Sequence, residues 1–323
     1  MKNIAILVLD GVLDSSLAIT LDCLRTAQTL AINTGSAARV RYQTIGAAPQ
    51  ALTGCGLRLS VDATFETARA PDWVVVPGLG IASERELDAR LAQADARQAM
   101  RWLGGLAGGP ASIAASCSAV FLLAQAGLLD GRRATTTWWL APAFRARYPK
   151  VLLDDAKMLV SDGPRLSAGA ALAQLDLMLA LLTDTMGAAV AAMCARYLLI
   201  DQRPSQARYM IPEHLRQQDP AVAAAERWID AHLAGPVSVR ALAAALAMAP
   251  KTLARHVEAA SGASTIKLIQ RRRLLQAAHL LETTALSVEA VALRVGYGDS
   301  TALRKLIKRE FGVTPGALRG MAV

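Results

Sequence analysis

The residue with the clearest chemical potential is Cys117, which lies among small residues in the run Ala-Ser-Cys-Ser-Ala at positions 115–119. An apolar run precedes it and a helix-like run follows, so the pattern predicts a strand-to-helix turn of the nucleophile-elbow kind. The N–H groups at the start of that helix would lower the pKa of a thiol, and the loop at residues 77–80 would supply further backbone donors. An activated thiol is therefore the first chemistry to consider.

A cysteine nucleophile normally needs a base, and the first two thirds of the chain offer no histidine for that role. The four histidines stand at positions 214, 232, 256 and 279. We therefore expect no catalytic residue, no cofactor and no metal. Two interpretations of Cys117 remain open: it lines a cleft for a small polar metabolite, or it packs in the core, as free cysteines commonly do. The residues predicted to line the cleft are Gly78, Cys117, Ser118, Thr137 and Trp138, although tryptophans are more often core or interface residues.

A second set of candidate residues belongs to a unit that occurs twice near the C-terminal end. Residues 238–243 read Ser-Val-Arg-Ala-Leu-Ala, and residues 287–292 read Ser-Val-Glu-Ala-Val-Ala, 49 residues later. Leu253, Val257, Gly262 and Ser264 then match Leu303, Ile307, Gly312 and Thr314 at an offset of 50. A repeat of this kind indicates that one supersecondary unit is used twice.

Each copy has the spacing of a helix-turn-helix, predicted at residues 238–262 and 287–312. A serine begins the first helix of each copy as its N-cap, and Pro250 fits the first position of a second helix. Asp299 is suited to cap the other second helix. Ala249 at the matching position cannot cap, which costs the first copy about 1 kcal/mol.

The outward faces of the two second helices are basic and polar, as a helix in the major groove of DNA requires. The residues predicted to contact DNA are Lys251, Thr252, Arg255, Ser300, Thr301, Arg304, Lys305 and Lys308. A single cationic face is often merely solvated, but two in tandem favour DNA.

The elements that position these residues divide the chain into two predicted domains. Strand-like runs at 4–9, 39–45, 73–76 and 111–115 alternate with helix-like runs at 17–32, 119–125, 172–182 and 188–200. This alternation predicts an α/β domain, a parallel sheet flanked by helices, over residues 1–201. Prolines and polar residues indicate a linker at 202–219, and residues 220–323 read as all-α.

Composition agrees with this division. A chain of 323 residues exceeds one ordinary core. Residues 219–323 hold 14 Lys/Arg against 8 Asp/Glu, whereas residues 1–218 hold 21 against 18, so the positive charge is concentrated at the end that carries the repeat. The four cysteines lack metal-site or disulfide spacing, and no run is suited to crossing a membrane, so we expect a cytoplasmic protein without membrane partners.

Both predicted domains resemble known families. Residues 220–323 resemble the AraC/XylS regulator domain, notably at 286–297 and in the ending Phe-Gly-Val-Thr-Pro at 311–315. Residues 3–186 resemble the glutamine amidotransferase-like, flavodoxin-like fold of the ThiJ/PfpI group at residues 76–78, the Cys117 elbow, residues 127–136 and residues 167–169. In two places the sequence departs from that group, because Trp138 stands where a histidine is frequent and Ser16 stands in place of the thiol's acidic partner, with Asp14 out of register.

The resemblance implies a transcription regulator with a sensor and dimerisation domain. It also implies a long connecting helix between the two helix-turn-helix units, at about residues 265–281. The three arginines on that helix, at 271–273, either touch phosphates or are solvated or paired with acids. We expect it to bind double-stranded DNA as a homodimer and to respond to a small-molecule effector that the sequence does not identify. If it is an activator, as regulators of this family usually are, it also contacts RNA polymerase. Two alternatives stay open: a thiol-dependent amidase or hydrolase fused to a DNA-binding domain, and an architectural DNA-binding protein without an effector.

Overall fold

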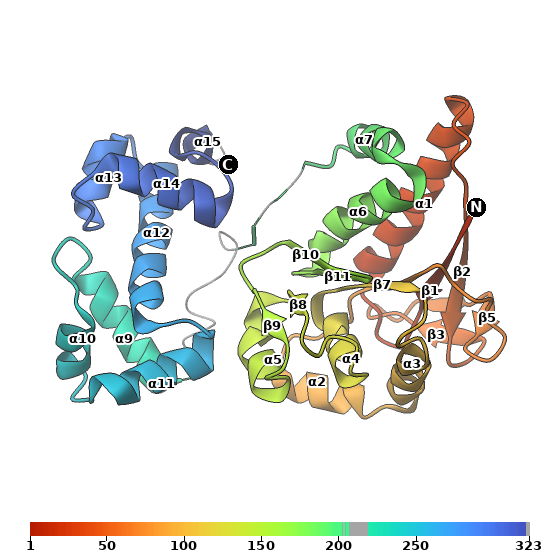
Figure 1. The fold of residues 1–323 in the computed structure, drawn as a ribbon, viewed down its shortest axis with the longest axis horizontal. Coiled ribbons are helices and arrows are strands. Elements are labelled where there is room, and N and C mark those ends of the chain that lie inside the picture. The colour runs from red at the N-terminus through yellow and green to blue at the C-terminus, as the bar shows by residue number, and fades with distance from the viewer. Residues whose placement is uncertain (202, 204, 207–218, 321–323) are drawn as a thin grey trace. The chain divides into compact units, whose positions relative to one another are not determined.

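The computed structural model describes residues 1–201, 203, 205–206 and 219–320. The chain forms two compact units, Met1–Arg203 and Pro204–Val323 (Figure 1). Of the linker predicted at residues 202–219, residues 203, 205–206 and 219 are described, and the rest of that prediction lies outside the described residues. No helix in the described part of the chain has the length and apolar character needed to cross a membrane.

A seven-stranded sheet forms the centre of the first unit, with strand order β10-β11-β7-β6-β1-β2-β5. Its strands are β1 (Lys2–Leu7), β2 (Val40–Gly46), β5 (Ala63–Thr64), β6 (Trp73–Val76), β7 (Ser112–Ser116), β10 (Leu159–Asp162) and β11 (Arg165–Ala168). Neighbouring strands are parallel except β10, which is antiparallel to β11. The run Trp-Val-Val-Val of β6 is buried throughout, as expected of a central parallel strand covered on both faces.

Helices cover both faces of this sheet (Figure 1). On one face, α1 (Asp14–Asn33), α6 (Gln174–Met186) and α7 (Ala188–Tyr197) share a core with the sheet. On the other face lie α2 (Glu84–Leu91), α3 (Ala94–Gly105), α4 (Val120–Gln125) and α5 (Ala141–Arg147). The predicted α/β architecture is confirmed. Two small sheets that the pattern did not predict pair β3 (Gln50–Leu52) with β4 (Arg58–Ser60) and β8 (Arg133–Ala134) with β9 (Leu152–Leu153).

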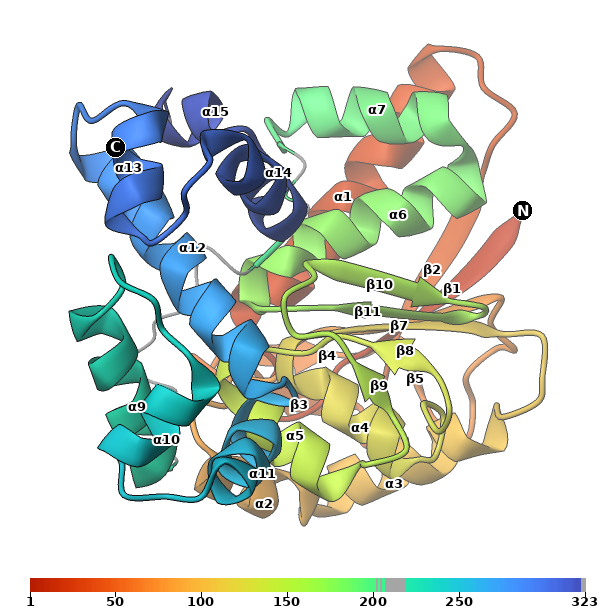
Figure 2. The ribbon, with the colours of Figure 1, turned by 60° about the vertical axis from the view of Figure 1, so that its left-hand side comes forward.

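The described residues of the second unit from Pro220 onward form helices joined by short turns (Figure 2). In chain order these are α9 (Pro220–Ala231), α10 (Val239–Ala245), α11 (Pro250–Ser261), α12 (Thr265–Thr283), α13 (Val288–Arg294), α14 (Ser300–Phe311) and α15 (Pro315–Gly320). The pairs α10–α11 and α13–α14 are the two helix-turn-helix units. The connecting helix α12 extends two residues beyond the predicted 265–281.

Local capping explains where these helices begin. Ser238 and Ser287 accept hydrogen bonds from the N–H groups three residues later, each at 3.1 Å. Asp299 accepts from the Thr301 N–H at 2.8 Å, whereas α11 begins after Ala249 with no side-chain cap and with Pro250 in its first turn. The predicted caps are confirmed, including the missing one.

Candidate nucleic-acid interface and candidate ligand site

The second helix of each helix-turn-helix unit, α11 or α14, has one buried face and one exposed face. Leu253 and Val257 of α11, like Leu303 and Ile307 of α14, are 0% exposed. The eight residues predicted to contact DNA lie away from these buried rows, with Thr252 and Ser300 partly buried and Lys251, Arg255, Thr301, Arg304, Lys305 and Lys308 exposed. The structure therefore leaves a basic, polar surface on each of the helices that a major groove would receive.

The second helices of the two helix-turn-helix units, α11 and α14, differ in one respect that sequence reasoning missed. Arg304 on α14 donates from Nη2 to Glu289 Oε1 on α13 at 2.8 Å. A backbone hydrogen bond of Glu289 and then the Arg304 side chain hold the pKa of this carboxyl below its usual value. The first helix-turn-helix unit carries Arg240, not an acid, at the position matching Glu289. That difference between the repeats was the signal available in the sequence.

The three arginines of α12 have structural partners. Arg272 is 9% exposed and donates from Nε and Nη2 to the two carboxylate oxygens of Asp230 on α9, at 2.8 and 2.5 Å. Arg271 Nε lies 4.0 Å from Glu310 Oε1. Arg273 donates to the Gly235 carbonyl at 2.9 Å. Of the roles left open by the sequence, pairing with an acid therefore describes Arg271 and Arg272.

In the first unit, Cys117 occupies the turn that the sequence predicted. It follows β7 directly, begins a 3₁₀ turn at Cys117–Ala119 and has a positive φ of 54°, a conformation that is uncommon for a residue with a side chain. Two hydrogen bonds hold the turn: Thr136 Oγ1 donates to the Cys117 carbonyl at 2.8 Å, and Ser118 Oγ donates to the Leu79 carbonyl at 2.7 Å. The backbone strain is thus supported by neighbouring loops.

Gly78 and Ser16 lie directly beside this elbow. A Cβ atom built on Gly78 would stand 3.1 Å from Cys117 Cβ and 3.3 Å from Ser16 Oγ, so a side chain there would have to push these neighbours away by a few tenths of an ångström. Ser16 therefore lies beside the thiol, as the resemblance implied. Asp14 instead accepts from the Cys55 N–H at 3.0 Å. The hydroxyl of Ser16 donates to the Ala171 carbonyl at 3.4 Å and supplies no negative charge to Cys117.

Burial raises the pKa of the Cys117 thiol, although the N–H and hydroxyl of Ser118 and the hydroxyl of Thr137 act in the opposite direction. The expectation that helix N–H groups would lower this pKa was therefore wrong in its net direction, because the side chain is only 2% exposed and desolvation outweighs the donors. At neutral pH the group is a neutral thiol. The arrangement can offer hydrogen bonds to a ligand, but it does not hold a thiolate.

All five residues predicted to line a cleft are buried: Gly78, Cys117, Ser118, Thr137 and Trp138. Trp138 packs edge-to-face on Trp139 with ring centroids 5.4 Å apart. The buried hydroxyl of Ser116 has no hydrogen-bond partner among the described residues, so a donor is left over next to the elbow. The structure brings Cys117, Ser118 and Thr137 together and places Gly78 against them, in a closed arrangement.

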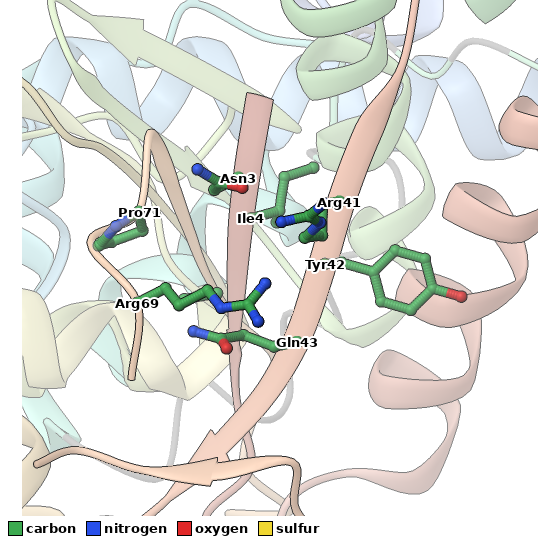
Figure 3. A pocket seen from close by; sticks show the side chains of 8 residues that line it. Asn3, Ile4, Arg41, Tyr42, Gln43, Arg69 and Pro71 are labelled. Carbon is green, nitrogen blue, oxygen red and sulfur yellow. The ribbon is translucent and has the colours of Figure 1, made fainter. Parts of the chain in front are cut away.

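Figure 3 shows a cavity elsewhere in this unit, where β1 and β2 begin. Its volume is about 40 Å³, and Asn3, Arg41, Gln43 and Arg69 contribute to its lining. It has room for about one water molecule. None of the predicted cleft residues lines it.

Comparisons with known proteins agree with both units. Residues 2–184 match the DJ-1/PfpI family, and residues 242–321 match a helix-turn-helix domain. The chain therefore belongs to the DJ-1/PfpI family, among the members in which this domain is followed by an AraC-type helix-turn-helix domain. The resemblances noted from the sequence are confirmed.

Its relatives include three proteins named as HTH-type transcriptional regulators. GbdR of Pseudomonas aeruginosa is 26% identical over 97% of this chain and 83% of its own length. GlxA of Rhizobium meliloti is 28% identical over 62% of this chain, and ArgR of Pseudomonas aeruginosa is 29% identical over 65%. The chain spans less than two thirds of the length of these last two, 63% and 64%.

Solved structures show the same fold for the first unit. An AraC family transcriptional regulator from Pseudomonas putida aligns with a TM-score of 0.50 and 21% identity, over 61% of this chain and all of its own. Drosophila melanogaster DJ-1beta aligns equally well, with a TM-score of 0.50 and 19% identity, over 62% of this chain and 99% of its own.

Proposed function

We propose that this protein is a sequence-specific transcription regulator, in which α11 and α14 read DNA and the region around Cys117 binds a small effector. The observation that carries the proposal is the repeat: two helix-turn-helix units expose basic faces on the same helix of each unit. Arg255, Arg304 and Lys305 contact base edges, while the remaining predicted residues contact bases or position the helices on phosphates.

The first unit acts as the sensor and the dimerisation domain. Its candidate ligand site contains hydroxyls, backbone groups and a neutral thiol, which suits a small polar metabolite. Because the site is closed, ligand entry requires movement of side chains such as Trp138. A change in this unit would then alter how the two DNA-binding units of a homodimer engage DNA. We expect this to take place in the cytoplasm. As an activator, the protein would also contact RNA polymerase.

A genome-wide map of binding sites, made with the intact protein, tests this function. We expect a few strong sites that share one motif and lie upstream of a small set of genes. A second step applies the metabolites those genes act on to the purified protein and follows promoter DNA binding. Binding scattered evenly along the genome, with no shared motif, would contradict a sequence-specific regulator.

The alternative is a thiol-dependent amidase attached to a DNA-binding domain, which the strained backbone at Cys117 favours. Its buried neutral thiol and the absence of histidine from residues 1–213 oppose it. Replacing Cys117 by alanine separates the two functions. If Cys117→Ala still gives effector-dependent transcription, thiol catalysis is not required. If the response disappears while the variant still folds and binds DNA, turnover of the effector by the wild-type protein decides: hydrolysis of the effector supports the alternative, and an unchanged effector means that Cys117 only lines its binding site.

A further inference from the structure

A pocket of about 430 Å³ lies between the two helix-turn-helix units of the second domain. On one side is the loop at residues 234–238, which leads into α10. On the other side are Gly296, Tyr297 and Gly298, in the turn between α13 and α14. Arg273 of α12 also lines the pocket. These residues bring the start of the first unit and the turn of the second unit to one place.

The guanidinium of Arg273 contacts both sides. Its Nη2 donates to the Gly235 carbonyl at 2.9 Å, and its Cζ lies 5.7 Å from the centre of the Tyr297 ring, in cation–π range. Burial raises the pKa of the Tyr297 hydroxyl, with the Arg273 charge acting in the opposite direction. One side chain of the connecting helix thus links two loops that are 62 residues apart in the sequence.

The backbones of the two loops also approach closely at Gly296. This residue has a positive φ of 79°, and a Cβ atom on it would lie 2.4 Å from the Leu233 carbonyl oxygen and 2.7 Å from Arg273 Nη2. A side chain there would push the Leu233 backbone away. Only glycine permits both this conformation and this contact.

Apart from these contacts, the first helix-turn-helix unit has a core of its own. Its buried residues come from α9, α10, α11 and the beginning of α12, including Leu268 and Ile269. The buried residues Val291, Leu303, Ile307 and Phe311 belong to α13 and α14 instead. A bend or twist of α12 would therefore change the distance between the readers unless a second contact opposed it.

We propose that Arg273, Gly296 and Tyr297, together with the Gly235 carbonyl, form an inter-unit clamp that fixes how far apart α11 and α14 stand. The clamp thereby sets the number of base pairs between the two segments of an operator that one protomer accepts. Arg273 is a positioning residue that contacts no base. The inference rests on the proposed reading of DNA by both helices.

The test measures tolerance of spacing. Duplexes recovered from a random pool by the intact wild-type protein define the operator. Derivatives then lengthen or shorten, by one base pair in each half of the operator, the gap between the two segments that one protomer contacts. We expect the wild-type protein to lose affinity by about tenfold or more on each altered gap, because α11 and α14 can no longer contact their DNA segments at the same time. Arg273→Met should bind the original operator more weakly but differ by less than about threefold across the gaps.

Two further variants separate the clamp from folding. Tyr297→Leu removes the ring but leaves the Arg273–Gly235 hydrogen bond, and it should also flatten the dependence on spacing. Tyr297→Phe keeps the ring and should behave as wild type. Melting temperatures are measured for all variants, since a loss of folded protein lowers binding to every gap by one factor.

If Arg273→Met and Tyr297→Leu both weaken binding by the same factor at all spacings, the clamp does not set spacing and the proposal is overturned. A negative result with the wild-type protein would also overturn the proposed function. If wild type recovers no shared sequence, or is itself indifferent to spacing, the proposal that both helices read DNA fails, and the clamp fails with it.

Discussion

Glu289 holds the Arg304 side chain in a half-exposed ion pair, whereas the first helix-turn-helix unit carries Arg240 at the position matching Glu289. An arginine that must reach a guanine edge has to exchange this partner for the base. Exposed pairs of this kind contribute little to stability, so the exchange is feasible. If both helices read DNA as proposed, Arg255 and Arg304 meet it from different starting contacts, although they belong to copies of the same repeated unit.

The first prediction concerns base reading by Arg255 and Arg304. Replacing either with alanine should cost about 1–3 kcal/mol on the best operator and relax base preference in one half of it, a different half for each. Arg227→Ala, on the exposed side of α9, is the control and should affect all sequences alike. Binding to a library of singly substituted operators measures this. Uniform weakening by both variants, without a change of preference, would contradict the assignment.

The second prediction concerns thiol reactivity. Burial raises the pKa of Cys117, so its thiol stays protonated at pH 7 and becomes a thiolate only at a pH above the ordinary range for cysteine. Cys55 is exposed, although a hydrogen bond to Asp14 raises its pKa as well. We expect iodoacetamide to label Cys55 of the native protein well before Cys117, as measured by mass spectrometry. The unfolded protein, in which all four cysteines react, is the control, and rapid labelling of native Cys117 would refute the prediction.

For individual residues, the sequence predicted the features that depend on local sequence and missed those that depend on contacts between distant parts of the chain. The serine and aspartate caps and the neighbours of Cys117 follow from residue type and spacing. The Glu289–Arg304 pair and the contacts of Arg273 depend on how helices and loops are placed, which periodicity does not specify. The direction of the Cys117 pKa was mistaken because the sequence shows the donors at a helix start but not the depth of burial.

Among the elements, the regular parts of the fold could be predicted best. Amphipathic or apolar runs such as α14 and β6 have a clear period or composition, whereas the connecting helix α12 was expected from the resemblance alone. The start of α1 was predicted three residues late, because Leu13 precedes the helix without a side-chain cap and gives no signal. Short strands such as β8 and β10 have two and four residues, too few for a pattern to stand out.

Capping leads to the third prediction. The backbone at Ala249 is extended, with φ −70° and ψ 142°, which is the conformation of an N-cap residue. Ala249→Ser should therefore stabilise α11 by about 1 kcal/mol, while Ser287→Ala should destabilise α13 by a similar amount. Hydrogen exchange of peptides from α11 and α13, followed by mass spectrometry, measures both in the intact protein. Faster exchange of α11 in Ala249→Ser would show that serine does not cap there.

For the molecule as a whole, the division into units determines how DNA binding should depend on salt and on dimerisation. The second unit carries most of the net charge and its own hydrophobic core. Asp219 belongs with it, because its carboxylate accepts from the Ala221 N–H at 2.8 Å and contacts His256 Nδ1 on α11 at 2.8 Å. A fragment intended to fold alone should therefore begin at Asp219 and not at Pro220.

The last prediction compares this fragment with the full chain. Each lysine or arginine that neutralises a phosphate releases counterions, so log K should fall with log salt by roughly 0.9 for each phosphate contacted. If the first unit dimerises, the full chain places two DNA-binding units on one operator, and its slope should be about twice that of the fragment, with tighter binding at every salt concentration. Filter binding or fluorescence anisotropy between low and physiological salt measures both slopes. Equal slopes and equal affinities would mean that the first unit does not bring two DNA-binding units together. A slope near zero would mean that phosphate contacts do not drive binding at all.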